Sequence, residues 1–257
     1  MITAGIDIGH RSLNAVLLDG DRIVTHLTLV VSGAVEAAAR TTFDRLLSQA
    51  GIPAEKVNRI FATGVGRETV SFAHGHPTGM LSHVHGAHWL FPEARTVIDM
   101  GAEGSRILRC DAGGNLINFV MNDKCASGGG VFLETVAEMM HLSLSEMGPL
   151  SLKSSGKVVL TTTCAVFAES EIVAEIHRGA SREDILWGVH ESLAIKIAQT
   201  SNRTDLEREI VLTGGVARNI GVVKALEKQF ACDLLAPEHP QIIGALGAAL
   251  MAGDKNR

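Results

Sequence analysis

The sequence predicts an α/β fold built from a structural unit that occurs twice. Each copy opens with an apolar strand that ends in an Asp-x-Gly turn, "ITAGIDIG" at 2–9 and "TVIDMG" at 96–101. In each copy a later strand ends in Thr-Gly, "IFATG" at 60–64 and "EIVLTGG" at 209–215. Further strands and helical sequence lie between these ends. Strands that alternate with helices are typical of α/β domains, and 257 residues are enough for one large domain or two small ones.

In the first copy, local signals predict each element. The stretches "LNAVLLDGD" and "RIVTHLTLVV" at 13–31 predict two strands joined by an Asp-Gly turn. The Ala-rich stretch 34–51 predicts a helix, because its apolar residues recur at helical spacing and Gly51 can end it. The segment "RIFATGVG" at 59–66 predicts the returning strand.

The second copy carries more helical sequence than the first. The stretch "SRILRCDAGGNLINFVMND" at 105–123 predicts a hairpin with a Gly-Gly turn. Helices are expected over about 126–141, 165–178, 182–202, 218–229 and 241–253. No linker rich in Pro, Ser or charge separates the copies, so the join is placed near 91–95. The sequence thus predicts an N-terminal domain at 1–94 and a C-terminal domain at 95–257.

Composition excludes several function classes. The chain is 46% hydrophobic and 4% aromatic, and its net charge is −5. Because it has no dense run of Lys and Arg, we expect no nucleic-acid partner. It has no apolar run of about 18 residues and no signal-peptide-like start, so we expect a cytoplasmic protein that does not span a membrane. In that reducing setting its four cysteines are expected to be free thiols or metal ligands.

Two Asp-x-Gly turns that face one another have a use in nucleotide binding. Each turn can bring backbone close to phosphates while its aspartate, Asp7 or Asp99, reaches Mg²⁺ or its waters. The later "TGGVA" at 213–217 follows a strand and opens a helix, which suits a ribose or a base edge. These motifs, in this order on a duplicated pattern, resemble the actin-like ATPase superfamily of sugar kinases, Hsp70 and actin. That resemblance implies two ribonuclease-H-like domains with a nucleotide cleft between them.

Two cysteines stand at the starts of predicted helices. Cys125 lies in "NDKCASGGGVFLE" and Cys164 lies in "TTTCAVFAESE". A helix N-terminus lowers the pKa of a thiol and stabilises an anionic group held there. Two thiolates make half of a four-cysteine iron–sulfur site, and a dimer could supply the other half across its twofold axis. The glycines at 128–130 would then let the partner's backbone and the cluster come close.

The motifs resemble the ATP-dependent activators of 2-hydroxyacyl-CoA dehydratases and the related ATPase subunits of benzoyl-CoA reductase, the BadF/BadG/BcrA/BcrD ATPase family. The resemblance runs along nearly the whole chain, through "GIDIG", "ATGVGRE", "VIDMG", "NDKCASGGG", "TTTCAVFAESE", "LTGGVARN" and "GALGAAL". It implies a dimer bridged by one shared [4Fe–4S] cluster, with Cys125 and Cys164 of each protomer as ligands. It also implies that hydrolysis of MgATP makes a low-potential electron available to a partner.

The resemblance further implies site residues and partners. Asp7, Asp99 and Glu103 are assigned to catalysis. The residues assigned to binding ATP and Mg²⁺ are Gly9, His10, Arg11, Ser12, Asn14, Gly101, Gly214, Gly215, Asn219 and Gly244. The expected partner is an iron–sulfur dehydratase or reductase, and the expected electron donor is a ferredoxin or a flavodoxin. The chain would act as a homodimer, or as a heterodimer with a related ATPase subunit.

Two stretches depart from the family pattern. Family activators often carry small hydroxyl residues and a Lys after the first Asp-x-Gly, where this chain has "HRSLN" at 10–14. Their second motif is often Gly-Gly-Gln-Asp, where this chain has "GAEG" at 101–104. The carboxylate of Glu103 would repel phosphate unless Mg²⁺ or a proton intervenes. The stretch 82–102 is nearest to the D-type subunit of benzoyl-CoA reductase, so catalysis is expected to be weaker here or shared with a partner.

Simpler explanations and other functions stay open. Cys110 and Cys232 are expected to be packing residues. The histidines at 74, 76, 83, 85 and 88 are expected to be solvated or to cap helices rather than bind metal. An actin-like small-molecule kinase would need a carboxylate base and would have no use for the two cysteines. A weakly catalytic subunit of a heterodimeric ATPase is a third possibility, suggested by His10 and Glu103.

Overall fold

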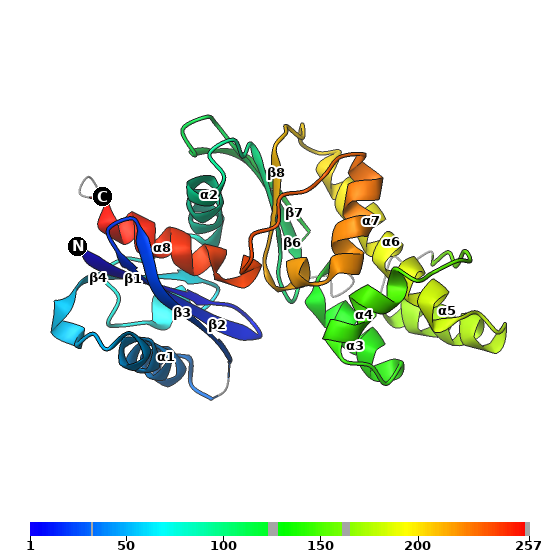
Figure 1. Cartoon of the computed structure of the whole chain (residues 1–257), viewed down its shortest axis with the longest axis horizontal. Coiled ribbons are helices and arrows are strands. Elements are labelled where there is room, and N and C mark those ends of the chain that lie inside the picture. Colours follow the sequence, from blue (N-terminus) through cyan, green and yellow to red (C-terminus); the bar gives the residue numbers. More distant parts are fainter. Residues whose placement is uncertain (32, 123–127, 161–164, 255–257) are drawn as a thin grey trace.

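The computed structural model describes residues 1–31, 33–122, 128–160 and 165–254. It contains two four-stranded mixed sheets (Figure 1). The first has the order β3-β2-β1-β4, with β1 (Ile2–Ile8), β2 (Ser12–Asp19), β3 (Arg22–Val30) and β4 (Val57–Gly64). The second has the matching order β7-β6-β5-β8, with β5 (Thr96–Met100), β6 (Ser105–Cys110), β7 (Leu116–Asn122) and β8 (Ile210–Thr213). The predicted repeat is confirmed, because in both sheets the first strand pairs antiparallel with the second and parallel with the fourth.

The registers place equivalent residues at equivalent points of the two sheets. In the first sheet, Asp7 of β1 lies opposite Thr63 of β4. In the second sheet, Asp99 of β5 lies opposite Thr213 of β8. Because these pairs are parallel, each sheet presents an aspartate and a threonine at the same edge.

The first sheet is covered on one face by an amphipathic helix. The helix α1 (Val35–Ala50) turns its apolar side to the sheet through Ala39, Phe43, Leu46 and Leu47. Gly51 ends the helix in the left-handed conformation, at φ 66°, as predicted. Two short 3₁₀ turns, η1 (Ala54–Lys56) and η2 (Arg67–Thr69), lie on either side of β4.

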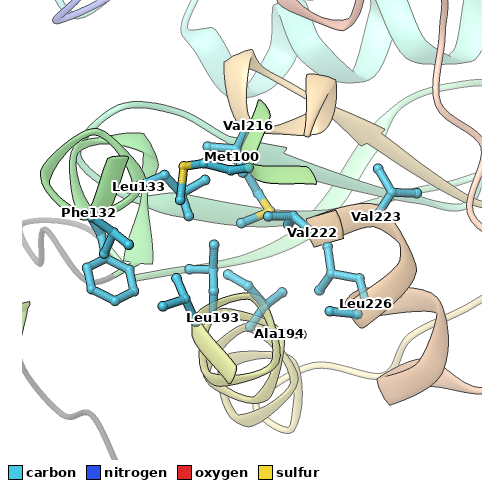
Figure 2. Packing of buried hydrophobic residues seen from close by; sticks show 14 of the residues in the cluster. Met100, Phe132, Leu133, Leu193, Ala194, Val216, Val222, Val223 and Leu226 are labelled. Carbon is cyan, nitrogen blue, oxygen red and sulfur yellow. The ribbon is translucent and has the colours of Figure 1, made fainter. Parts of the chain in front are cut away.

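Helices between β7 and β8 build the core beneath the second sheet. Those in the described part of the chain are α3 (Gly130–Met139), α4 (Leu144–Ser151), α5 (Ala165–His177) and α6 (Arg182–Ser201). The 3₁₀ turn η4 (Gly215–Arg218) and α7 (Ile220–Phe230) follow β8. Figure 2 shows Met100, from the end of β5, among Leu133 of α3, Leu193 of α6 and Val222 of α7. Met100 follows Asp99 directly, so this core fixes the position of that aspartate.

Two helices lie between the sheets and join them. The helices α2 (Gly79–Leu90) and α8 (Ile243–Gly253), the latter preceded by η5 (Pro240–Ile242), pack against one another in the centre of the molecule (Figure 1). Their core includes buried residues of both sheets, among them Val16, Leu18, Val97 and Leu108. In sequence α8 follows the second sheet, yet it packs on β1, β2 and β4 of the first. The division of the chain into domains at 94/95 stays a prediction.

Glycines allow α8 to lie very close to its neighbours. A Cβ at Gly247 would overlap the carbonyl oxygen of Ser82 in α2, and a Cβ at Gly5 of β1 would overlap that of Ala245 in α8. The tight packing of small residues in this last helix therefore brings backbone against backbone. Within the described ranges, no helix combines the length and apolar character needed to cross a membrane.

Candidate functional site

A cavity of about 500 Å³ opens at the edge where β1, β4, β5 and β8 end. Asp7 and Asp99 reach it from opposite sheets. Turns and helix starts from both sheets complete its wall, among them Gly9, His10, Arg11, Gly101, Ala102, Gly130, Glu134, Ser145, Gly214, Gly215, Arg218 and Asn219. Its volume lies in the range of sites for small molecules and cofactors.

The turn after β1 and the turn after β5 are each closed by an equivalent backbone hydrogen bond. The N–H of Gly9 donates to the carbonyl of Ser12 at 2.9 Å, and the N–H of Gly101 donates to the carbonyl of Gly104 at 2.9 Å. Both turns therefore bring main chain to the cavity wall in the same way, which suits close approach by an anionic ligand.

Glycines also surround the two aspartates. Gly64 and Gly214 follow the two threonines and have φ of 86° and 87°, which favours glycine. A Cβ at Gly64 would overlap a carboxylate oxygen of Asp7, and one at Gly214 would lie 2.8 Å from Oδ1 of Asp99. Gly244 of α8 lies on the other side of Asp7, where a Cβ would overlap Oδ2. The repeated Thr-Gly pair thus leaves room for a carboxylate in each sheet.

His83 of α2 lies between the two aspartates. Its Nδ1 is 3.0 Å from Oγ1 of Thr213 and 3.6 Å from Oδ1 of Asp99. Its Nε2 is 3.8 Å from Oδ2 of Asp7. The side chain is only 7% exposed, so the expectation of a solvated or capping residue is wrong for this histidine.

The surrounding charges set the ionisation of His83. Burial by itself disfavours the imidazolium, but attraction to Asp99 and then the contact with Asp7 outweigh it, so the pKa of His83 is raised. Arg106 opposes this rise, and its Nη1 lies 3.5 Å from Oδ2 of Asp99. The floor of the cavity therefore places nitrogen donors beside both carboxylates.

Ion pairs cross the rim of the cavity. Nε2 of His10 lies 3.1 Å from Oε2 of Glu103, which joins the turn after β1 to the turn after β5. Nη2 of Arg11 lies 3.0 Å from Oε2 of Glu134 in α3. Since these side chains are 37% to 61% exposed, each pair adds little stability and can be replaced by contacts with a charged ligand.

Asn219 caps a helix at the cavity wall. Its Oδ1 accepts from the N–H groups of Gly221 at 2.9 Å and Val222 at 3.3 Å, at the start of α7. Its Nδ2 lies 3.2 Å from Nε2 of His190, whose Nδ1 lies 3.0 Å from Oγ of Ser151 in α4. Burial lowers the pKa of His190 to about 4, so the ring is neutral at pH 7. The amide of Asn219 is thus held by α6 and α7.

Gly129 and Gly130, at the start of α3, lie against the turn after β5. The N–H of Gly130 donates to the carbonyl of Gly101 at 2.9 Å, and the N–H of Val131 donates to that of Ala102 at 2.9 Å. A Cβ at Gly129 would lie 2.5 Å from the carbonyl oxygen of Ala102. These glycines therefore bring α3 against the turn, a contact that the sequence did not suggest.

Most residues assigned to nucleotide binding meet at this cavity. Its wall includes the predicted residues Asp7, Gly9, His10, Arg11, Ser12, Asn14, Asp99, Gly101, Gly214, Gly215 and Asn219. Glu103 pairs with His10 at the rim, and Gly244 lies against Asp7. The individual roles assigned to these residues stay predictions.

The predicted cluster ligands, Cys125 and Cys164, lie outside the described residues. Among the residues that are described, no group of three or more His, Cys, Asp or Glu side chains could hold a metal ion. The other two cysteines pack as predicted. Cys110 is buried, which raises the pKa of its thiol, and its Sγ donates to the carbonyl of Ala94 at 3.4 Å. Cys232 is half-buried against the core of the second sheet.

Sequence reasoning missed His83, Arg106 and Glu134. A signal existed for Arg106, because it lies opposite Asp99 as Asn14 lies opposite Asp7. No comparable signal existed for His83, since α2 was not among the predicted helices.

Comparison with known proteins agrees with this geometry. The BadF/BadG/BcrA/BcrD ATPase family matches residues 4–252. The chain belongs to this family. Among BadF/BadG/BcrA/BcrD relatives, the 2-hydroxyisocaproyl-CoA dehydratase activator of Clostridioides difficile is 37% identical, over 99% of this chain and 96% of its own length. The D-type subunit of benzoyl-CoA reductase from Thauera aromatica is 35% identical, over 97% of this chain and 92% of its own length.

Solved structures confirm the predicted actin-like α/β fold of this family member. The activator of the 2-hydroxyisocaproyl-CoA dehydratase from Clostridium difficile, with bound ADPNP, superposes with a TM-score of 0.93 at 37% identity and covers 98% of this chain and 94% of that one. A ROK hexokinase from Thermus thermophilus superposes with a TM-score of 0.55 at 16% identity over 100% of both chains. At that identity the hexokinase shows the fold alone.

Proposed function

We propose that this family member hydrolyses ATP in the cavity and thereby delivers low-potential electrons to a partner enzyme. The observation that carries the proposal is the meeting of Asp7 and Asp99, from equivalent points of two sheets, on one cavity. The names of relatives support it, because they describe dehydratase activators, an activating ATPase and a component of a reductase. A solved relative that carries bound ADPNP supports nucleotide binding.

The donor set of the cavity fits a magnesium nucleotide. Carboxylates such as Asp7 and Asp99 are ligands that Mg²⁺ accepts directly or through its waters. The turns after β1 and β5 and the guanidinium of Arg11 suit phosphate oxygens, and the Gly214 turn suits a ribose. Bound Mg²⁺ would supply charge stabilisation for the transferring phosphoryl group. The chain's own part is to orient the nucleotide with these groups.

The electron-transfer part of the proposal depends on Cys125 and Cys164. In the sequence, Cys125 stands shortly before α3 and Cys164 directly before α5. Two thiolates from each of two chains would complete the ligands of a [4Fe–4S] cluster, which supplies one-electron chemistry when bound. The proposal therefore includes a homodimer, or a heterodimer with a related ATPase subunit.

The proposed partners follow from the relatives. The electron acceptor would be an iron–sulfur dehydratase or reductase acting on a CoA thioester, as the names of the relatives suggest. The electron donor would be a ferredoxin or a flavodoxin in the cytoplasm. An anaerobic pull-down that identifies the co-purifying protein would name the acceptor.

The nucleotide part is tested by thermal melting with and without MgADP or MgATP. Binding to the folded chain alone should stabilise it by about 2.7 kcal/mol at a hundredfold excess over Kd. Asp7→Asn should lose most of the shift in melting temperature, while Asp21→Asn, in the exposed turn after β2, should keep it. A wild-type chain indifferent to millimolar MgATP contradicts the proposal.

The cluster part is tested by iron and sulfide analysis after anaerobic reconstitution. One cluster per dimer predicts about two Fe per chain. Cys125→Ser and Cys164→Ser should lose the cluster yet still bind nucleotide, whereas Cys110→Ser and Cys232→Ser should retain it. Iron-free wild-type protein, or a full cluster in Cys125→Ser, would exclude the assignment.

A weakly catalytic subunit of a heterodimeric ATPase is a second candidate. The pair between His10 and Glu103 favours it, because it places a carboxylate at the rim beside the turns proposed for phosphate. Rapid ATP turnover by the isolated chain would count against this candidate, and turnover only after mixing with a related subunit would support it.

A further inference from the structure

We propose that His83 is a positioning residue that sets the separation of Asp7 and Asp99 and so controls the Mg²⁺ dependence of nucleotide binding. The inference rests on the proposed function, because it takes the cavity to be a magnesium-nucleotide site. It adds a role for α2, which lies outside the two Asp-x-Gly turns and the Thr-Gly strands.

Consecutive residues of α2 contact equivalent points of the two sheets. The hydroxyl of Ser82 donates to Oγ1 of Thr63 at 3.0 Å, and Nδ1 of His83 lies 3.0 Å from Oγ1 of Thr213. All four residues are buried. Since each threonine lies opposite an aspartate in its sheet, α2 fixes the two aspartate-bearing edges relative to one another.

His83 also lies directly between the carboxylates. Its two ring nitrogens face Asp99 at 3.6 Å and Asp7 at 3.8 Å, and Arg106 is the further charged group that acts on the ring. Gly244 of α8 leaves space for this arrangement, because a Cβ there would lie 2.8 Å from Nε2 of His83. A nitrogen donor between two carboxylates offsets their mutual repulsion and holds both in place.

The position of His83 separates this role from direct catalysis. The ring lies between the two aspartates and is only 7% exposed, so its proposed action on a ligand is through their carboxylates. Groups that orient metal-binding carboxylates typically change metal affinity by about 10- to 100-fold when they are removed. If His83 has the proposed role, a His83 variant should therefore lose affinity for the nucleotide only when Mg²⁺ is present.

The test compares calorimetric titrations with ADPNP in Mg²⁺ and in EDTA. His83→Asn keeps a polar atom near the position of Nδ1, His83→Gln keeps one near Nε2, and Thr213→Val removes a hydroxyl at nearly constant volume. Each variant should bind ADPNP in EDTA within about twofold of wild type, and each should lose about tenfold or more of the tightening that Mg²⁺ provides. In ATP hydrolysis with Mg²⁺, KM should rise by a similar factor, because the affinity lost is affinity for the bound nucleotide.

A matched control is His88→Gln, on the same helix but against Gly114 of the hairpin between β6 and β7. It should behave as wild type, and circular dichroism should show that every variant is folded. Folded His83 variants that keep the wild-type response to Mg²⁺ overturn the inference.

A second readout needs no nucleotide. In protein labelled with ¹⁵N-histidine, the ring N–H shared with Thr213 should exchange slowly with water, and Thr213→Val should abolish that protection. Rapid exchange in the wild type overturns the inference and leaves nucleotide binding untouched. A wild type that binds no ADPNP contradicts the proposed function, while slow exchange would still support the contact between α2 and the second sheet.

Discussion

His190 makes the folded chain sensitive to mild acid. Its pKa is about 4 when folded, against an ordinary value of 6.5. Below pH 6.5 the unfolded chain binds a proton that the folded chain does not, so the free energy of unfolding falls as the pH falls. The slope from this residue reaches at most ~1.4 kcal/mol per pH unit. Hydrogen bonds, chiefly from Ser181 and Ser154, lower the pKa of Asp184 to about 2. Asp184 therefore reduces the free energy of unfolding only at a lower pH than His190 does.

Urea unfolding of wild type and His190→Gln between pH 5 and pH 7.5 should isolate this slope. The variant should be less stable at pH 7.5 by about 1–3 kcal/mol, because the hydrogen-bonding groups of Asn219 and Ser151 are left with a poorer partner. Its stability should depend less on pH than that of the wild type. Parallel curves for the two proteins would show that His190 does not titrate as its burial indicates.

Single residues of the site differed in how far the sequence could identify them. Asp7 and Asp99 could be found because each lies near the end of a buried strand, two residues before a glycine, and this pattern occurs twice. The double use of Asn219 as a helix cap and a partner of His190 depends on a contact between α6 and α7, which local sequence does not encode. The contact of His83 with both sheets likewise depends on tertiary packing.

At the scale of elements, α2 and α8 can cross closely because the residue at the crossing, Gly247, has no side chain. A Cβ at Gly247 would overlap the backbone of Ser82, and backbone cannot move aside as a flexible side chain can. Gly247→Ala should therefore destabilise the chain by about 1–3 kcal/mol or more, as overpacking does in other cores. Urea unfolding measures this change.

Gly253→Ala provides the matched control in the same helix. A Cβ there meets its nearest atom, in Met1, at an ordinary 3.5 Å. The control should be neutral or should stabilise the chain by up to about 1 kcal/mol, because alanine reduces the freedom of the unfolded chain. Equal effects of the two substitutions would mean that α8 can shift away from α2 without loss.

The elements that the sequence predicted are those with a local periodic signal. The helix α1 has one apolar side and a glycine at its end, and the strands are apolar runs bounded by turns. By contrast, α2 is enclosed by both sheets and α8, and it carries small or apolar residues on most sides. Its sequence therefore shows no single apolar stripe at helical spacing. The helix α4 has only eight residues, too few to establish a period.

At the scale of the whole molecule, the two sheets meet through a shared core and through the rim of the cavity. The core around α2 and α8 contains buried residues of both sheets. The rim contains the exposed pairs of His10 with Glu103 and of Arg11 with Glu134. Burial of apolar surface stabilises far more than exposed ion pairs do, so the core holds the sheets together and the rim pairs can respond to a ligand.

Replacing Glu103 by Gln should therefore change ligand binding more than stability. Without the carboxylate, repulsion of phosphate at the rim decreases, and MgATP should bind about twofold to fivefold more tightly at low salt. The gain should shrink as salt screens the charges. Titration calorimetry at two salt concentrations measures both effects.

Glu55→Gln is the control for Glu103→Gln, because it removes one negative charge at an exposed position in η1, which does not line the cavity. It should leave the affinity for MgATP unchanged. Weaker binding by Glu103→Gln would show instead that the carboxylate assists the nucleotide, as its assignment to catalysis implies.

The position of α8 in the sequence also affects how the chain folds during its synthesis. The first sheet is complete once β4 has emerged from the ribosome, but the helix that covers its β1, β2 and β4 is made only after the whole second sheet. Because synthesis proceeds at roughly 5–20 residues per second, that face of the first sheet stays uncovered for on the order of ten seconds or longer. During this interval an apolar surface is open to chaperones and to aggregation. Ribosome-bound chains that stop before Ile243 should therefore resist proteolysis less than chains that include α8.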